Sequence, residues 1–434
     1  MAPLVQDTLA NVHIALARQL GDLAGMGTVA SAYASSISTQ DLIQQRSNQL
    51  RGHHLYFYGG AAVQQDRVIN AFTPYSVAGQ VALLTVLRPY VSGSTPSVNT
   101  TFLVHRLFSG TEYNQAIAHA VARAQRRQLT PKFDRSLVMN TLALNAVFAM
   151  WTNGAAVAPD SWTLTGTNGA VARESSQVYP NLKYSAKVTN GASQEAYLSQ
   201  SLADYGRMAG QVIDVSVDVH CQTTNRVRIA LLDGTNTWYS DYHTGAGKET
   251  LTISSKTLAT AITQCTVQLR TETGAAIDAY WEKVHWSGGG DVYEYPLSTY
   301  PTGFVYVSEV WIEGDQEGVF NLQVPDDWWY IDRYTKRLVL LRGMCEPSAE
   351  GGKVIEVRGQ AYAAIPSAET DTVDVDNSYV LARAAHDLLK RLPKGASDSE
   401  GYTQMMAESL SEAERLERRM STVAWPNARP VEEL

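Results

Sequence analysis

The sequence has few cysteines and no long hydrophobic run. Cys221, Cys265 and Cys345 are the only cysteines among 434 residues, and none forms a Cys-x-x-Cys pair. A disulfide framework in a secreted chain normally uses an even set, so we expect folding in a reducing cytoplasm. No apolar stretch approaches the ~20 residues of a membrane helix, and the N-terminal stretch is amphipathic and bears an acidic residue, unlike a signal peptide. We therefore expect neither a membrane anchor nor a cleaved signal.

Positive charge is also scarce. Lysine and arginine number 35 against 43 acidic residues, which gives a net charge of -8. Proteins that bind the phosphate backbone of nucleic acids need a concentrated basic surface, so nucleic-acid binding is disfavoured as the main function. The hydrophobic fraction of 44% is that of a folded protein, and the length suits two or three domains.

Catalytic and metal-binding motifs are missing as well. The sequence holds no Gly-rich phosphate loop, HExxH, GxSxG or Cys/His cluster. His53 and His54 open an alternating strand and would point to opposite faces, which is poor geometry for one metal ion. A glycosidase carboxylate pair cannot be chosen, because the separation it needs is a property of the fold. We predict no catalytic residues, no metal site and no cofactor, and expect that the protein is not an enzyme.

Helical patterns occur at both ends of the chain. An apolar stripe from Leu9 to Leu23 predicts a helix capped by Asp7 and ending at Gly25 or Gly27. Ser109 and Glu112 form a capping-box sequence, which predicts a helix ending near Gln128. Four alternating runs between these helices predict a small antiparallel sheet or barrel of four or five strands.

The C-terminal part is predicted to contain strands and then two helices. The phrases GFVYVSEVWIEG, DWWYIDRYTKRLVLLRG and KVIEVRGQAYAAI are typical of strands. Asp376 or Asn377 can cap the first helix, Leu392-Pro393-Lys394-Gly395 can end it, and a second helix is predicted from Tyr402. Their apolar stripes supply the candidate contacts to other subunits or to a portal protein: Leu381, Leu388, Met405 and Leu416.

The middle of the chain, residues 137–287, alternates apolar and polar residues at strand spacing. Phrases such as GQVIDVSVDVHC and CTVQLRTETG predict a sandwich of eight or nine strands. LALNAVFAMWTNGAAVAPDSWTLTG from Leu142 and AAIDAYWEKVHWSGG up to Gly289 are predicted to form its first and last strands. We expect Trp151, Trp162 and Trp281 to pack in or against its core, together with Trp286.

The order of these phrases resembles carbohydrate-binding-module-like jelly rolls. The family opening N-G-x-F-E-x-W is similar to Asn145–Trp151, where Ala149 replaces a glutamate that is often a calcium ligand. Glu282 stands where the family usually has an aspartate, so calcium binding is not expected. Exposed aromatic planes are needed for a glycan, and the loop after Thr237 supplies the candidate glycan-binding residues Trp238, Tyr239 and Tyr242.

The flanking residues, 1–136 and 288–434, resemble the head-to-tail adaptor or connector proteins of tailed bacteriophages. The resemblance rests on phrases such as GTVASAYASSISTQDLI, DRVINAFTPYSVAGQVALL, DWWYIDRYTKRLVLL and VDVDNSYVLARAAHDLL. It implies a structural virion protein in the neck, assembled in the host cytoplasm as a ring of about twelve copies. Its partners would be portal and tail proteins, with DNA passing through the ring without specific binding.

Together these patterns predict an α+β multidomain chain. A host domain of helices and a small antiparallel sheet, residues 1–136 and 288–434, is interrupted by an all-β jelly-roll sandwich, residues 137–287. The alternatives to an adaptor are a glycan-binding receptor-recognition or fibre component of the virion and a carbohydrate-active enzyme with a binding module.

Overall fold

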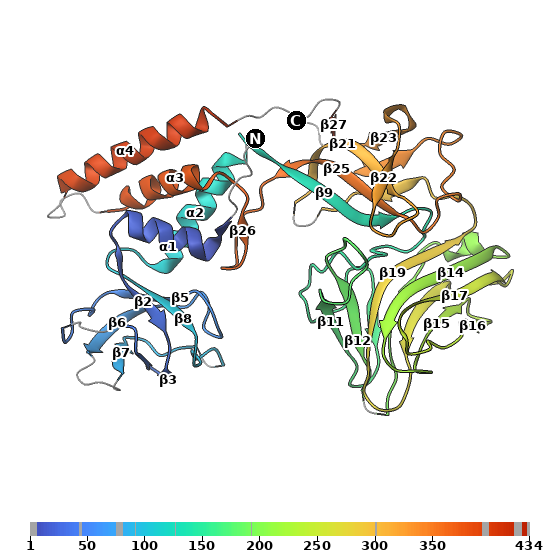
Figure 1. The fold of residues 1–434 in the computed structure, drawn as a ribbon, viewed down its shortest axis with the longest axis horizontal. Helices are drawn as coiled ribbons and strands as arrows, with labels where there is room; N and C mark the ends of the chain where they lie inside the picture. Colours follow the sequence, from blue (N-terminus) through green and yellow to red (C-terminus); the bar gives the residue numbers. More distant parts are fainter. Residues whose placement is uncertain are drawn as a thin grey trace. The chain divides into compact units, whose positions relative to one another are not determined.

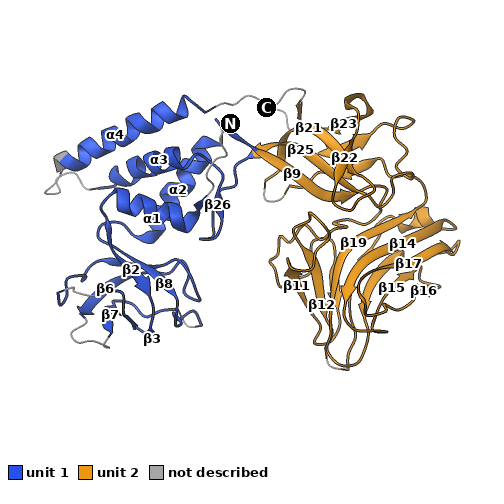
Figure 2. Ribbon diagram, viewed as in Figure 1, with its two compact units in different colours: residues 1–130, 362–423 blue, residues 131–361, 424–434 orange. Residues whose placement is uncertain are grey.

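The computed structural model describes residues 7–42, 46–74, 81–91, 93–125, 127–191, 193–299, 302–392, 399–420 and 428–431. The chain forms two compact units, residues 1–130 with 362–423 and residues 131–361 with 424–434 (Figure 2). We call them unit 1 and unit 2. The predicted boundaries at 136 and 287 do not coincide with this division, because the strands between residues 288 and 361 belong to the same unit as the sandwich.

Unit 1 is a layer of helices beside an antiparallel sheet (Figure 1). The described helices are α1 (Leu9–Gln19), α2 (Gly110–Ala124), α3 (Asn377–Leu389) and α4 (Ser399–Glu417). The sheet has seven strands in the order β2 (Leu23–Thr28), β8 (Thr101–His105), β5 (His54–Phe57), β6 (Asp66–Thr73), β7 (Ala82–Val86), β4 (Ser36–Thr39) and β3 (Ser31–Tyr33). β1 (Asp7–Thr8) pairs separately with β26 (Thr372–Val373).

The first helix is shorter than predicted. Thr8, not Asp7, is its N-cap, and the Thr8 hydroxyl accepts a hydrogen bond from the backbone N–H of Asn11. The helix ends at Gln19, and Gly21 follows with a φ of +66°, a left-handed conformation that glycine adopts without strain. The chain then enters β2, so the prediction that the helix reaches Gly25 or Gly27 is wrong.

The second helix confirms the capping box. Ser109 accepts from the backbone N–H of Glu112, and the Glu112 carboxylate accepts from the backbone N–H of Ser109. The helix ends at Ala124, a turn before the predicted end near Gln128.

The sheet of unit 1 is larger than predicted. β5, β6, β7 and β8 lie in the four alternating runs that the sequence indicated. The additional strands are β2, β3 and β4, which cover a Gly- and Ser-rich stretch with little apolar alternation. Pairing with neighbouring strands gives these segments their extended conformation despite their weak intrinsic preference.

The C-terminal helices pack inside unit 1. Asp376 caps α3 through the backbone N–H of Ser378, as predicted, whereas residues 393–395 lie outside the described residues. Leu388 is fully buried in the core that α1, α2 and α3 share, so its predicted role in subunit contacts is corrected. Leu381, Met405 and Leu416 are partly buried against the same core.

Unit 2 contains a sandwich of two five-stranded sheets, and each neighbouring pair of strands is antiparallel. The first sheet has the order β10 (Thr163–Thr165), β13 (Ala196–Ser201), β18 (Thr266–Thr271), β15 (Val227–Leu232) and β16 (Thr237–Tyr239). The second has the order β11 (Ala170–Glu174), β12 (Ser185–Thr189), β19 (Asp278–Gly288), β14 (Val212–Cys221) and β17 (Gly247–Thr257). The four expected tryptophans are buried in the core.

The two phrases predicted to form the first and last strands of the sandwich lie together, although the first of them does not begin with a strand. Residues 142–151 form turns and irregular structure, and the first strand of the sandwich begins at Thr163. The backbone N–H of Leu142 donates to the carbonyl of Trp286 at 2.6 Å, and that of Val284 donates to the carbonyl of Ala146 at 2.8 Å. The opening phrase therefore runs along β19, which lies at the centre of its sheet.

The rest of unit 2 consists of two further sheets. One has the order β22 (Phe320–Gln323), β21 (Phe304–Glu313), β25 (Val354–Tyr362) and β9 (Leu129–Val138), with β27 (Arg429–Pro430) also paired to β21. The other has the order β20 (Glu294–Pro296), β24 (Arg337–Leu340) and β23 (Trp329–Asp332). Tyr179 of the sandwich donates a 3.0 Å hydrogen bond to the buried carboxylate of Glu313 on β21, which ties the sandwich to these strands.

Among the described residues, no helix is long and apolar enough to cross a membrane.

Candidate functional site

The outer face of the β10–β13–β18–β15–β16 sheet gathers aromatic and polar side chains. Side chains alternate between the two faces of a strand, so Leu198, Leu269 and Ile229 enter the core while their neighbours face outward. Cross-strand pairing places Tyr197 opposite Arg270, and Arg270 opposite Arg228. The next outward row consists of Ser199, Gln268, Ala230 and Tyr239. We call this surface the tyrosine–arginine face.

Tyrosine rings and guanidinium groups are interleaved on this face. The Arg228 guanidinium lies 3.9 Å from the ring centre of Tyr239 and 4.7 Å from that of Tyr242. Arg270 lies 5.2 Å from the ring centre of Tyr197 and 5.9 Å from that of Tyr239. Tyr239 and Tyr242 are 44% and 37% exposed, so both retain ring surface for a ligand.

Carboxylate and amide groups hold the two arginines in place. Glu272 accepts a 2.7 Å hydrogen bond from Nε of Arg228, and its Oε1 lies 3.5 Å from Nε of Arg270. Arg270 also donates to Gln268 at 2.7 Å and to the Glu195 carboxylate. Two positive and two negative groups cancel, so the face is rich in hydrogen-bonding groups and close to electrically neutral.

A buried histidine shapes the loop that carries Tyr242. Nδ1 of His243 accepts from the backbone N–H of Gly245 at 2.8 Å, so Nε2 carries the proton of the neutral ring and donates to the carbonyl of Gly247 at 2.9 Å. The hydroxyl of Ser240 accepts from the backbone N–H of Ile229 and donates to the carbonyl of Asp241. The Ser240 bond links the loop to β15, and the His243 bond to Gly247 links it to the start of β17.

A buried aspartate shapes the turn before β16. Asp233 accepts hydrogen bonds from the backbone N–H groups of Thr235, Asn236 and Ala259 at 2.6 to 2.9 Å. Burial alone would raise the pKa of Asp233, but these donors outweigh it and keep the pKa below its usual value. The carboxylate therefore stays charged and fixes the turn that leads to Tyr239.

The structure separates the predicted glycan-binding residues. Tyr239 and Tyr242 lie at the tyrosine–arginine face. Trp238 pairs with the inward-facing Leu231 and packs against the core of the sandwich, so it lies on the opposite side of the sheet from Tyr239. The alternation of β16 requires this, because neighbouring residues of a strand face opposite ways.

The sequence patterns did not predict four other residues of this face, which are Tyr197, Arg228, Gln268 and Arg270. Their outward positions could be read from the alternation in AYLSQS, VRIALL and TVQLRT. What the alternation does not give is the order of the strands. β13, β18 and β15 are far apart in sequence and become neighbours only through the sheet topology.

The positions compared with calcium ligands form no cation cage. Ala149 packs against the core, and the buried Glu282 carboxylate lies 3.6 Å from the Lys248 ammonium. Burial raises the pKa of Glu282, and Lys248 opposes this shift. Within the described ranges, no group of three or more His, Cys, Asp or Glu residues is placed to hold a metal ion.

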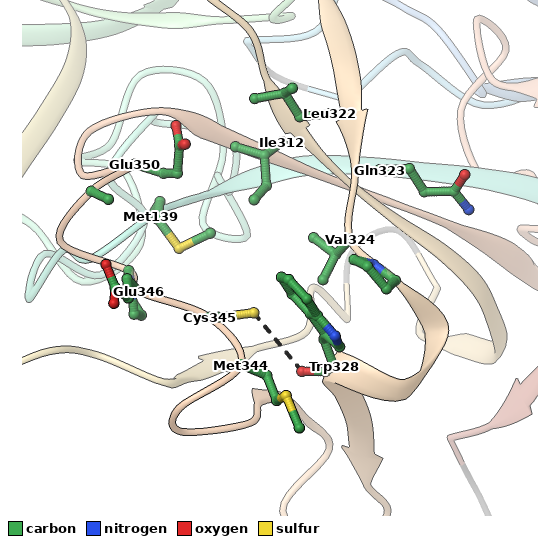
Figure 3. A pocket seen from close by; sticks show the side chains of 13 residues that line it. Met139, Ile312, Leu322, Gln323, Val324, Trp328, Met344, Cys345, Glu346 and Glu350 are labelled. Carbon is green, nitrogen blue, oxygen red and sulfur yellow. Dashed lines mark hydrogen bonds between the residues drawn. The ribbon is translucent and has the colours of Figure 1, made fainter.

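An apolar cavity of about 380 Å³ lies beside β22 (Figure 3). Its lining includes Ile312, Leu322, Val324 and Trp328, with Cys345 close to Trp328. Burial raises the pKa of the Cys345 thiol, which disfavours the reactive thiolate. The cavity offers packing surface but no activated nucleophile.

Comparison with known proteins finds no matching family model and no matching curated protein. The enzymatically active domain of bacteriophage CBA120 tailspike protein 4 is 14% identical over 30% of this chain and 19% of its own chain, with a TM-score of 0.25. The C-terminal family 22 carbohydrate-binding module of Clostridium thermocellum Xyn10B is 15% identical over 33% of this chain and 98% of that module, with a TM-score of 0.24. A family 11 module from Clostridium thermocellum, in complex with a mixed-linked tetrasaccharide, is 8% identical over 30% of this chain and 92% of the module, with a TM-score of 0.21.

Proposed function

We propose that the chain binds a carbohydrate through the tyrosine–arginine face of the sandwich. The observation that carries the proposal is the exposed pair Tyr239 and Tyr242 around the Arg228 guanidinium. A sugar ring presents both C–H groups and hydroxyls, so it needs an apolar plane next to directional polar groups. Aromatic rings supply the plane, and arginine and glutamine supply the polar groups.

The charge of the face favours a neutral glycan. Glu272 and Glu195 already engage Arg228 and Arg270, so no full positive charge is left to recruit an anion. Sugar hydroxyls can accept hydrogen bonds from the remaining guanidinium N–H groups and donate hydrogen bonds to the carboxylates without breaking these ion pairs.

The extent of the face favours a short oligosaccharide. Tyr197 and Tyr239 lie on strands separated by β18 and β15. The Arg270 guanidinium lies 5.2 Å from the ring centre of Tyr197 and 5.9 Å from that of Tyr239, so the two ring centres are no more than about 11 Å apart. This span suits a ligand of about two sugar units lying across the strands.

A glycan array followed by titration calorimetry on the full chain tests the proposal. The double variant Tyr239→Ala, Tyr242→Ala should abolish binding of the best neutral oligosaccharide. Tyr334→Ala is the matched control, because Tyr334 is 96% exposed on a turn elsewhere in unit 2. This variant removes a tyrosine ring that is not part of the tyrosine–arginine face. Silence across a broad array, or equal affinities of both variants, would contradict the proposal.

The resemblance of the flanking residues to head-to-tail adaptors stays a prediction. It concerns portal and tail partners, a ring of about twelve copies and a place in the virion neck. A ring would need contact residues other than the buried Leu388. Light scattering on the purified chain, alone and mixed with a portal protein, measures whether a ring forms.

A further inference from the structure

A second cavity of about 380 Å³ lies in unit 2, away from the tyrosine–arginine face. Part of its wall comes from the turn-rich segment Thr141–Met150 of the sandwich, and part comes from β20, Arg337 and Arg342 of the three-stranded sheet region. Pockets of about 300 to 1,000 Å³ hold small ligands, and the volume of this one is sufficient for a monosaccharide.

Arginines dominate the charge of this cavity. Arg207, Arg337 and Arg342 line it, against the carboxylates of Asp291 and Glu294. Arg337 is already paired with Glu294 at 3.0 Å. The ion pairs of the other two arginines therefore decide what the cavity can bind.

Two of these guanidinium groups keep most of their donors free. Arg342 lies 5.2 Å from the ring centre of Tyr293 and forms no ion pair within the described residues. Among the residues that the structure describes, the one ion-pair partner of Arg207 is Asp204, 4.0 Å away, and Asp204 is 83% exposed and outside the cavity lining. A guanidinium carries five N–H donors in a planar fork that matches the two oxygens of a carboxylate.

A glycine run lets the backbone form one wall. Gly288, Gly289 and Gly290 all have positive φ angles, of 142°, 70° and 113°. A Cβ at Gly288 would lie 2.5 Å from the carbonyl oxygen of Val212, and a Cβ at Gly289 would lie 2.8 Å from the Met208 sulfur. The positive φ angles favour glycine at all three positions, so this run contributes backbone and no side chains to the wall.

We propose that this cavity binds a carboxylate-bearing sugar such as a hexuronate. Arg342 and Arg207 receive the carboxylate, and the Tyr293 ring and the polar wall receive the sugar ring. The assignment rests on the excess of guanidinium groups and on the volume, and it does not depend on glycan binding at the tyrosine–arginine face.

Titration calorimetry of the full chain with sodium glucuronate tests the proposal, with glucose as the neutral counterpart. We expect glucuronate to bind and glucose not to bind. Arg342→Gln should weaken glucuronate binding about tenfold or more, because a charge-assisted bidentate contact is lost. Arg418→Gln, at a site 82% exposed on the C-terminal side of α4 in unit 1, should leave the affinity unchanged.

Further titrations decide between the possible ligands. Sulfate or phosphate binding as tightly as glucuronate would overturn the assignment to a sugar acid, since the oxyanion alone would then account for the affinity. Equal affinity for glucose and glucuronate, or an unchanged affinity in Arg342→Gln, would also overturn it. Tyr239→Ala should leave glucuronate binding intact, so failure here is distinguishable from failure of the tyrosine–arginine face.

Discussion

The carboxylate of Glu272 accepts a 2.7 Å hydrogen bond from Nε of Arg228 and thereby holds the guanidinium over the Tyr239 ring. The same oxygen lies 3.5 Å from Nε of Arg270 on the neighbouring strand. Glu272 therefore positions both arginines of the face, although it lies just past the end of β18.

Replacing Glu272 should weaken glycan binding without unfolding the sandwich. Glu272→Ala frees the Arg228 guanidinium to move and removes one of the two carboxylates beside Arg270, which keeps Gln268 and Glu195 as partners. We expect a loss of about 1 to 2 kcal/mol in binding free energy. Glu174→Ala, which removes a partly exposed carboxylate from the opposite sheet, is the control. Calorimetry with the best array ligand measures both variants, and an unchanged affinity in Glu272→Ala would show that the arginines do not contact the ligand.

The loop that carries Tyr242 should depend on His243. Asparagine at this position cannot reach both the Gly245 N–H and the Gly247 carbonyl, so a buried hydrogen bond is lost. We expect His243→Asn to lower the free energy of unfolding of unit 2 by about 1 to 3 kcal/mol. Chemical denaturation followed by tryptophan fluorescence measures this. His220→Asn is the control, because His220 is less deeply buried and lies on the other sheet; an equal loss in both variants would contradict the assigned role.

Local sequence patterns predicted elements better than they predicted surfaces. The capping box of Ser109 and Glu112 sets a helix start through contacts within four residues, so the sequence was sufficient there. Tyr239 and Arg228 meet through a strand pairing, and Arg228 meets Arg270 through another pairing across about forty intervening residues. Such pairings depend on the global topology, which alternation within single strands does not encode.

The same limit explains why Leu388 was predicted to contact another subunit although it is buried within one chain. Its helical stripe was correctly identified as apolar, but the stripe alone does not say whether the covering surface comes from the same chain or from another copy. In the structure, α1 and α2 share a core with α3, and Leu388 is buried in this core.

Truncating Leu388 should therefore destabilise a single chain. Leu388→Ala leaves a cavity among the helices, and we expect a loss of about 2 to 5 kcal/mol in the free energy of unfolding of unit 1. Leu381→Ala, at a partly buried position on the same helix, should cost less. Helical circular dichroism during urea unfolding measures both. A Leu388→Ala chain with unchanged stability would mean that the side chain is not buried within one copy.

Unit 1 should lose stability in mild acid because two histidines are buried against each other. Nε2 of His13 lies 3.2 Å from Nε2 of His105, and both side chains are fully buried. One ring must donate its Nε2 proton while the other accepts it, so a further proton on the pair would set two N–H groups against each other. Tyr113 stacks on His13 and donates to Asp22, whose carboxylate lies 3.9 Å from Nδ1 of His105.

The direction of the effect follows from the pKa values. Burial, and then the neighbouring His105, lowers the pKa of His13 well below 6.5, and burial lowers that of His105 to about 4 against the opposing charge of Asp22. Between pH 6.5 and about 4 the unfolded chain binds more protons than the folded chain, so the free energy of unfolding falls as the pH falls. His54 and Glu369 act in the opposite direction, because their pKa values are raised, the first chiefly by its hydrogen bond to Asp66 and the second by burial.

Hydrogen exchange of the α2 amides between pH 7.5 and 4.5, corrected for the intrinsic exchange rate, measures this loss in unit 1. We expect His105 alone to contribute up to about 3 kcal/mol over the window. All nine tryptophans fall in the residue ranges of unit 2, so their fluorescence reports separately on that unit. His13→Asn should flatten the decline in α2 protection, whereas His54→Asn should steepen it because a stabilising protonated group is removed. Equal slopes in the wild-type chain and His13→Asn would show that the buried pair does not govern the acid response of unit 1.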